Sequence, residues 1–400
     1  MEKQNRKGWG LFALGLVVGL LVALVITSIL FRKNVSIPED SLVNERVLGK
    51  VQYLETLIHD KFYLKEVTDE ELEEGIYRGI LEALDDPYSV YYTRNELDSL
   101  MEQTHGIYFG VGAYVAIDTA TTLPKISGVI DGTPAQEADL RPNDLIYMVD
   151  DVLTQGMKLT DVVALIKGPD GTSVKLTLIR ENESDYVEKT LTRRQVESPT
   201  VKYEMLEDGM SYIEITEFDD VTVDQFADAL ATVKGSGAKG IILDLRGNPG
   251  GNLSTVIDVA RMILPQGLIV YTEDKAGNRK EYSCDGNRQL QLPLVVLVDG
   301  NSASAAEILS GAIQDYKLGT LVGTTTFGKG IVQQVFTLED RSAVKITISS
   351  YYTPNGRNIH GTGIEPDVVC EFDGETYYNT EDHYDNQLEK AKEVLKNKMQ

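Results

Sequence analysis

The pattern of apolar residues is most pronounced near the N-terminus. Residues 9–31 form a run without a charged side chain. At about 1.5 Å per residue, a helix of this length crosses a hydrocarbon core of about 30 Å. Three basic residues precede the run and two follow it, a slight bias that favours a short cytoplasmic stub at residues 1–8. The pattern predicts a single-pass anchor in the cell membrane over residues 9–31, with the bulk of the chain outside the cytoplasm.

The alternative for this run is a signal peptide that is removed after export. The run is longer than the usual apolar core of a signal peptide, and no A-x-A cleavage site lies near its end. We therefore expect the anchor to remain on the mature chain.

Two stretches with apolar residues at helical spacing follow the anchor. They cover residues 42–57 and 70–84, after a short linker at 34–41, and the second ends at an Asp-Asp-Pro stop. We predict a helical N-terminal unit over residues 34–104. Three tyrosines follow the stop, and we expect them to pack this unit against its neighbour without a chemical role: Tyr88, Tyr91 and Tyr92.

From residue 105 to 197 the chain changes to short β-type runs separated by glycine turns, with one amphipathic helix at residues 159–166. Five motifs in this order resemble a PDZ domain: Phe109-Gly110-Val111-Gly112, Ile126-Ser127-Gly128-Val129, Thr133-Pro134-Ala135, residues 139–146 and residues 167–172. PDZ domains add a C-terminal peptide to a sheet edge, and loop N–H groups hold its carboxylate. The resemblance implies that the loop at 110–113 does this here, and that Phe109, Gly110, Val111 and Gly112 bind substrate. Taken alone, each glycine pair would serve only a tight turn.

Beyond residue 198 the pattern alternates between buried strands and helices, which is typical of an α/β core. The predicted strands are 212–215, 239–245, 292–298 and 320–322, and the predicted helices are 223–234 and 302–316. Apolar and polar residues alternate over 344–349, which predicts a strand with one solvent-facing side. We predict an α/β core over 198–372 and a tail over 373–400 that closes with a helix at 386–395. The fold class is therefore α/β, multidomain, with the β-rich module placed before the core.

Composition removes several classes of function. The 400 residues include 38 Lys plus Arg and 62 Asp plus Glu, a net charge of −24 that disfavours nucleic acid as a partner. The two cysteines, Cys284 and Cys370, are too few for a zinc ribbon or a disulfide scaffold. The four histidines form no HExxH pattern. We expect no metal and no organic cofactor.

One glycine-rich motif imitates a nucleotide site. Residues 323–329 match the GxxxxGK start of a phosphate-binding loop, but Gly330 stands where a Ser or Thr binds magnesium. The following residues read as a strand rather than a helix. Nucleotide hydrolysis is therefore not predicted, and Lys329 needs another explanation.

Two loops at the ends of predicted strands carry residues suited to acyl transfer. Residues 299–307 lead from a buried strand into a helix and include two serines, and residues 248–251 form a glycine turn after another strand. Amides at a helix N-terminus point at developing negative charge, so the Ala305 N–H and an amide of the glycine turn are suited to hold an oxyanion. The plainer interpretation is that Ser302 or Ser304 caps the helix and that the turn is ordinary.

Lys329 is the obvious general base, because neither loop contains a histidine. A lysine acts as a base only when it is neutral. Lowering its pKa from about 10.4 to near 7 takes about 4.6 kcal/mol, which burial in an apolar pocket can supply. Gln333, four residues on, is suited to orient the amine.

These loops and the PDZ motifs together resemble the C-terminal processing peptidases, a family of tail-specific serine–lysine proteases. The matching stretches are residues 84–89, the PDZ motifs, and residues 243–251, 302–308, 326–333 and 351–357. The resemblance implies that Ser304, in preference to the serine two positions earlier, is the nucleophile and that Lys329 is the general base. It further implies that Gln333 orients the base and that Gly251 and Ala305 form the oxyanion hole.

The resemblance implies a membrane-anchored serine endopeptidase that binds the free C-termini of protein or peptide substrates and cleaves them through an acyl-enzyme. It also implies a homodimer, since the N-terminal helical unit and the C-terminal helix resemble segments that pair subunits in relatives. The alternative function is a non-catalytic PDZ tether or chaperone that binds C-terminal tails and releases them.

Overall fold

The computed structural model describes residues 41–381 and 383–400. The predicted stub and anchor, residues 1–31, lie outside this range. Within it, no helix combines the length and the apolar character needed to cross a membrane. The chain divides into two compact units, with the boundary between Ile80 and Leu81, and each unit is described by itself.

The N-terminal unit is helical, as predicted. Helix α2 (Glu45–Lys61) begins where the Asn44 side chain accepts a hydrogen bond from the Val47 amide, and helix α3 (Asp69–Glu82) continues past the unit boundary. Helix α2 buries none of its residues. Several of its apolar side chains are therefore exposed, including Leu48, Leu54 and Leu57.

The segment after α3 departs from the sequence prediction, which placed it in the helical unit. Strand β1 (Val90–Tyr92) pairs antiparallel with β18 (Ala343–Tyr352) of the core. Helix α4 (Arg94–His105) follows; it starts at a Thr93–Glu96 capping box and ends at Gly106 in the left-handed conformation, with φ 65°. Helix α4 was not predicted as a separate helix, because only Leu97, Leu100 and Met101 among its twelve residues are apolar.

The β-rich module consists mainly of short strands, as predicted, and includes the expected amphipathic helix. Strand β2 (Ile107–Gly110) pairs with β9 (Arg194–Glu197) where the chain enters and leaves the module. The module's sheet has the order β3-β4-β5-β7-β8, with β6 paired to β5. Its elements are β3 (Ala113–Ile117), β4 (Pro124–Val129), α5 (Pro134–Glu137), β5 (Leu145–Val149), β6 (Val152–Leu153), α6 (Leu159–Ile166), β7 (Ser173–Ile179) and β8 (Val187–Thr192).

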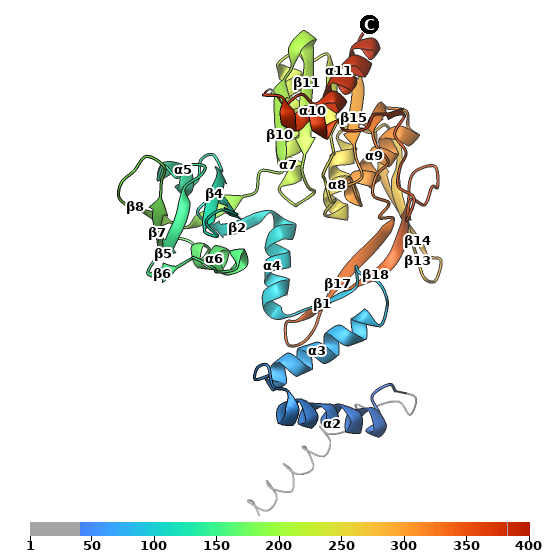
Figure 1. Cartoon of the computed structure of the whole chain (residues 1–400). Coiled ribbons are helices and arrows are strands. Elements are labelled where there is room, and N and C mark those ends of the chain that lie inside the picture. Colours follow the sequence, from blue (N-terminus) through green and yellow to red (C-terminus); the bar gives the residue numbers. More distant parts are fainter. Residues whose placement is uncertain (1–40, 382) are drawn as a thin grey trace, which may run out of the picture. The chain divides into compact units, whose positions relative to one another are not determined.

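The core is built on a six-stranded sheet of order β10-β11-β12-β15-β16-β19, parallel except for its first pair. Figure 1 labels β10, β11 and β15 of this sheet. The strands are β10 (Val201–Met205), β11 (Met210–Ile215), β12 (Gly240–Asp244), β15 (Leu294–Val298), β16 (Gly319–Gly323) and β19 (Val368–Val369). The helices are α7 (Thr222–Gly235), α8 (Leu253–Arg261), α9 (Ala305–Asp315), α10 (Gly374–Asn379) and α11 (Asn386–Lys398), with a short 3-10 turn η1 (Glu207–Gly209). The alternation predicted from the sequence is confirmed.

Both faces of this sheet are covered, which explains its uninterrupted apolar strands. Alternate residues of β12 face opposite ways: Ile241 and Leu243 pack with helices α7, α8 and α9, while Ile242 packs with Leu395 of α11. The tail helix is therefore part of the core, and it buries Gln387, Ala391 and Leu395.

A second sheet joins β1, β18, β13 (Gly267–Asp274) and β14 (Arg279–Cys284), with β17 (Ile331–Thr337) paired to β18. The expectation of one dry and one wet side on β18 is wrong. Ile348 on the apolar side is 37% exposed, and Lys345 on the polar side lines a cavity.

Truncation of Leu395 tests the packing of the tail helix. Its side chain is fully buried, so Leu395→Ala should lower the free energy of unfolding by about 2–5 kcal/mol. Urea denaturation followed by far-UV circular dichroism measures the change. Asn397→Ala, at an exposed position of the same helix, should change it by less than about 0.5 kcal/mol. Equal effects of the two substitutions would contradict this packing.

Candidate active site

A cavity of about 490 Å³ in the second unit brings together the residues singled out for acyl transfer. Its walls come from α4, the glycine turn, the start of α9, β17 and β18. All five predicted site residues line it: Gly251, Ser304, Ala305, Lys329 and Gln333. Residues separated by up to 82 positions in the sequence therefore share one concave surface, as the sequence analysis expected.

Ser304 lies at the N-terminus of α9 in an unusual backbone conformation. Its φ of 53° and ψ of −110° are costly for a residue with a side chain, and such geometry persists only where the surroundings hold it. The Tyr351 hydroxyl donates to the Ser304 carbonyl at 3.0 Å, and the Ser304 amide donates to Glu307 at 2.9 Å. The residue is thus fixed from both sides.

The geometry separates Ser304 from Ser302, which the residue pattern alone left open. Ser302 is fully buried. Its hydroxyl donates to the Leu245 carbonyl at 2.8 Å and accepts from the Asp299 amide at 2.9 Å. Ser302 therefore connects two strand ends, and Ser304 is the serine of this pair that lines the cavity.

The glycine turn packs directly against the start of α9. The Ala303 amide donates to the Asn248 carbonyl at 2.9 Å. A Cβ atom on Gly250 would lie 2.8 Å from the Cβ of Ser304, and one on Gly251 would lie 2.4 Å from the Phe218 carbonyl oxygen. Gly250 and Gly251 also have φ values of 106° and 138°. Glycine is therefore required at position 250 for the close approach to Ser304 and at position 251 for the close approach to Phe218.

Two backbone amides on the cavity wall are available to a ligand. Among the hydrogen bonds of the described residues, none is donated by the amide of Gly251 or of Ala305. Both residues line the cavity, and the Ala305 amide nitrogen lies 3.0 Å from where a Gly250 Cβ would be. Unpaired amides beside a serine at a helix N-terminus are suited to bind an oxyanion.

Glu307 is a buried residue beside the cavity that was not predicted as a site residue. Its side chain is fully buried and accepts four hydrogen bonds, at 2.5–2.9 Å. The donors are the Thr326 hydroxyl and the amides of Ser304, Gly328 and Lys329. The signal was present in the sequence, since Ser304 and Glu307 have the S-x-x-E spacing of a capping box.

Lys329 is half-buried, and its surroundings disfavour the charged form. Burial lowers the pKa of the Lys329 amine below the ordinary lysine value, and the positive charge of Lys345 lowers it further. The carboxylates of Asp86 and Glu307 oppose this shift without reversing it.

Tyr88 also contacts the lysine, contrary to the expectation that the tyrosines only pack. The Lys329 Nζ lies 4.5 Å from the centroid of the Tyr88 ring, within the range of a cation–π interaction. The other two tyrosines do connect neighbouring elements: Tyr91 is buried in β1, and the Tyr92 hydroxyl accepts from Lys345 at 2.7 Å.

A second cavity, of about 280 Å³, lies in the β-rich module between β3 and α6. Gly110, Val111 and Gly112 line it, as predicted, whereas Phe109 is not among its lining residues. The Phe109 side chain is 42% exposed. The mostly apolar walls and the glycine loop at one end suit an extended peptide with a terminal carboxylate.

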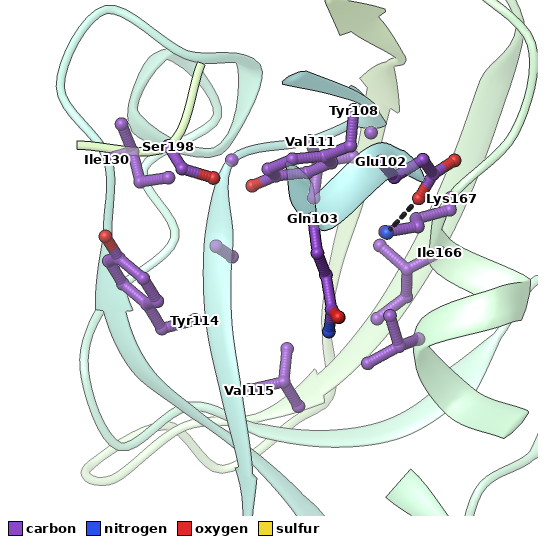
Figure 2. A pocket seen from close by; sticks show the side chains of 14 residues that line it. Glu102, Gln103, Tyr108, Val111, Tyr114, Val115, Ile130, Ile166, Lys167 and Ser198 are labelled. Carbon is purple, nitrogen blue, oxygen red and sulfur yellow. Dashed lines mark hydrogen bonds and ion pairs between the residues drawn. The ribbon is translucent and has the colours of Figure 1, made fainter. Parts of the chain in front are cut away.

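Side chains of α4 border this groove. Figure 2 shows Gln103 pointing into it between Val115 and Ile166. Beside it, Glu102 forms an ion pair with Lys167 at 2.6 Å. Leu100, Met101 and Thr104 of the same helix line the larger cavity, so α4 contributes to the walls of both.

Within the described residues, one group of side chains has the spacing of a metal site: Glu55, His59 and Asp69. All three are exposed, and His59 is already paired with Asp69 at 3.0 Å. Exposed groups of this kind are common without a metal, and we assign none to it.

Comparisons with known proteins match family models to three segments of the chain. The family model described as Peptidase family S41 matches residues 209–370, a PDZ domain model matches 125–180, and a model described as Activating protease CtpB N-terminal domain matches 31–96. A Bacteroides fragilis protein assigned to the S41 proteases has a similar solved structure, with a TM-score of 0.53 at 17% identity over 86% of this chain and 97% of that one. That likeness shows the fold.

Two curated relatives extend over most of the chain. The carboxyl-terminal-processing protease of Synechocystis is 34% identical over 381 residues, which cover 93% of this chain and 89% of the relative. The carboxy-terminal processing protease CtpA of Bacillus subtilis is 36% identical over 310 residues, which cover 77% of this chain and 66% of the relative. With this identity over nearly the whole of the first relative, and with PDZ and S41 segments in the expected order, the chain belongs to the C-terminal processing peptidase family.

Proposed function

We propose that the chain is a membrane-anchored serine endopeptidase that recognises the C-terminal tails of proteins through its PDZ domain and cleaves them through an acyl-enzyme. The observation that carries this proposal is the cavity in which Ser304, a lysine of lowered pKa and two unpaired amides meet. Nucleophile, base and oxyanion donors are the three elements that acyl transfer requires.

In the proposed reaction the neutral Lys329 amine takes the proton of the Ser304 hydroxyl as the serine oxygen attacks the scissile carbonyl carbon. The amides of Gly251 and Ala305 hold the resulting oxyanion, each donor contributing about 3 kcal/mol in the transition state. The C–N bond then breaks, and the lysine ammonium returns its proton to the leaving amine. Water, with Lys329 again as base, hydrolyses the ester and releases the serine.

Substrate selection is assigned to the groove between β3 and α6. A C-terminal peptide would add to β3, and the amides of the loop that contains Gly110, Val111 and Gly112 would hold its carboxylate. Phe109 lies next to this loop without lining the groove, so we leave it out of the proposed binding surface. The partners are therefore proteins or peptides with free C-termini.

Cleavage of an unstructured protein with an apolar C-terminus, followed by mass spectrometry, tests both assignments. Ser304→Ala and Lys329→Ala should each reduce the cleavage rate roughly a thousandfold or more. An amidated C-terminus should weaken capture, because the loop then has no carboxylate to bind.

Two substitutions at exposed or partly exposed positions away from the cavity serve as controls: Ser236→Ala at the C-terminal end of α7 and Lys392→Ala in α11. Both should cleave at the wild-type rate. Tail binding by the wild type without any cleavage would overturn the peptidase assignment and support the alternative of a non-catalytic PDZ tether or chaperone.

The membrane anchor at residues 9–31 and the placement of the catalytic unit outside the cytoplasm are part of this proposal. They rest on the length of the uncharged run and on the basic residues that flank it. Protease added to intact cells should degrade the protein. After cell lysis, the undigested protein should sediment with the membranes. Recovery of the protein in the soluble fraction of lysed cells would contradict the anchor.

We also propose a homodimer, supported by the apolar side chains that α2 leaves exposed. Leu48, Leu54 and Leu57 are 46%, 46% and 40% exposed, and apolar surface of this kind commonly marks an interaction site. Sedimentation of the protein in detergent at several concentrations tests the proposal, and a monomer at all concentrations would contradict it.

The pH profile tests Lys329 as the base. Only the neutral amine takes a proton, so kcat/KM should fall as the pH falls through the pKa of Lys329. Lys345→Gln removes a positive charge that lowers this pKa. The pKa should therefore rise, and the acid limb of the profile should move to higher pH. Lys392→Gln, an equal change of charge in α11, should leave the limb in place, and an unchanged limb in Lys345→Gln would count against Lys329 as the titrating group.

A further inference from the structure

A chain of hydrogen bonds leads from Gln333 out of the catalytic cavity. The Gln333 Nε2 group donates to the Thr347 hydroxyl oxygen at 3.2 Å. The Thr347 hydroxyl in turn donates to the Asp86 carboxylate at 2.7 Å. Gln333 lies on β17, Thr347 on β18 and Asp86 in the turn before β1, so three separate segments meet at one hydroxyl group.

The Thr347 hydroxyl determines which end of the Gln333 carboxamide it faces. A hydroxyl has one proton, and a carboxylate can only accept. Because the Thr347 proton is used on Asp86, the hydroxyl oxygen can only accept from Gln333. The amide therefore turns its NH₂ group to Thr347. The reversed amide would place two acceptors against each other.

Asp86 remains an acceptor because its charged form is stabilised. Burial raises the pKa of this carboxyl, but hydrogen bonds from the hydroxyls of Ser89 and Thr347 and from the Tyr88 amide outweigh burial and leave the pKa below the ordinary value. The Ser89 hydroxyl donates to the same Asp86 oxygen at 2.6 Å and accepts from the Thr347 amide at 3.1 Å. Thr347 is thus held at both its backbone and its side chain.

We propose that Thr347 and Asp86 are positioning residues, which hold the Gln333 carboxamide with its oxygen directed away from Thr347 and available to the Lys329 amine across the cavity. This proposal rests on the proposed function, because Gln333 is there the residue that orients the base. Lys329 and Gln333 line the same cavity. An oxygen is the end of the amide that an amine can donate to, so the orientation matters for the reaction.

Substitution of Thr347 by valine, which has a similar shape, removes the hydroxyl. Thr347→Val should lower kcat roughly tenfold, the size of effect that follows removal of a hydrogen-bond partner that orients a metal ligand. KM should stay within about twofold, since Thr347 is not among the residues that line the cavity. Thr347→Ser keeps the hydroxyl and should restore kcat. Thr337→Val, an exposed threonine on β17, is the matched control and should behave as the wild type.

A double-mutant cycle separates positioning from a general loss of structure. If Thr347 acts through Gln333, Thr347→Val should cause no further loss of kcat in a Gln333→Ala background. Additive losses in the double variant, or no rescue by serine, would overturn the proposal.

Crystal structures of the wild type and of Thr347→Val provide a readout that does not depend on turnover. The Gln333 side chain should keep its place in the wild type and rotate or lose order in the variant. If the Gln333 side chain keeps its conformation in the variant, the positioning role of Thr347 and Asp86 is refuted, even if the enzyme is active. If the wild type shows Gln333 bound to Thr347 but cleaves no substrate, the proposed function is refuted, and the hydrogen bonds from Gln333 to Thr347 and from Thr347 to Asp86 remain as a structural contact.

Discussion

The arrangement of the cavity depends on one buried carboxylate, that of Glu307. It accepts hydrogen bonds from the amide of Ser304 on one side and from the amides of Gly328 and Lys329 on the other. The start of α9 and the loop before β17 are thereby bound to the same group. A buried carboxylate is tolerated only when hydrogen bonds or opposite charges satisfy it. Here its hydrogen-bond donors belong to the two segments that carry the proposed nucleophile and base.

The parallel sheet supplies the frame on which this contact is built. Strands β12 and β15 are neighbours and end at the same edge, so the glycine turn after β12 and the serine loop after β15 leave the sheet side by side. The loop after β11 reaches the same place, since the Phe218 amide donates to the Gly250 carbonyl and the Asn252 amide to the Phe218 carbonyl. These backbone hydrogen bonds, together with the buried Asn248 side chain, which donates to the Ile215 carbonyl and accepts from the Gly250 amide, hold the turn beside Ser304.

Much of this could be predicted from the sequence, and the reason is physical. Strands buried on both faces, such as β12 and β15, have a continuous apolar pattern, and the loops at their ends contain glycines and serines whose spacing is distinctive. The contributions of α4, Tyr88 and Thr347 could not be predicted. Helix α4 has only three apolar residues among its twelve. Thr347 contacts Asp86 across 261 positions of sequence, a distance over which a local pattern carries no information.

The pairing of β1 with β18 has a consequence for how the chain can be divided. Val90 to Tyr92, which lie before the PDZ module, form a ladder with Ala343 to Lys345, which lie after it. The PDZ module is thus inserted into the catalytic domain and is not a separate domain that precedes it. A fragment that starts after the module would lack the edge strand β1 and Asp86 beside it. Evolution or engineering can therefore replace the module only if the segment before it stays in the same chain as the core.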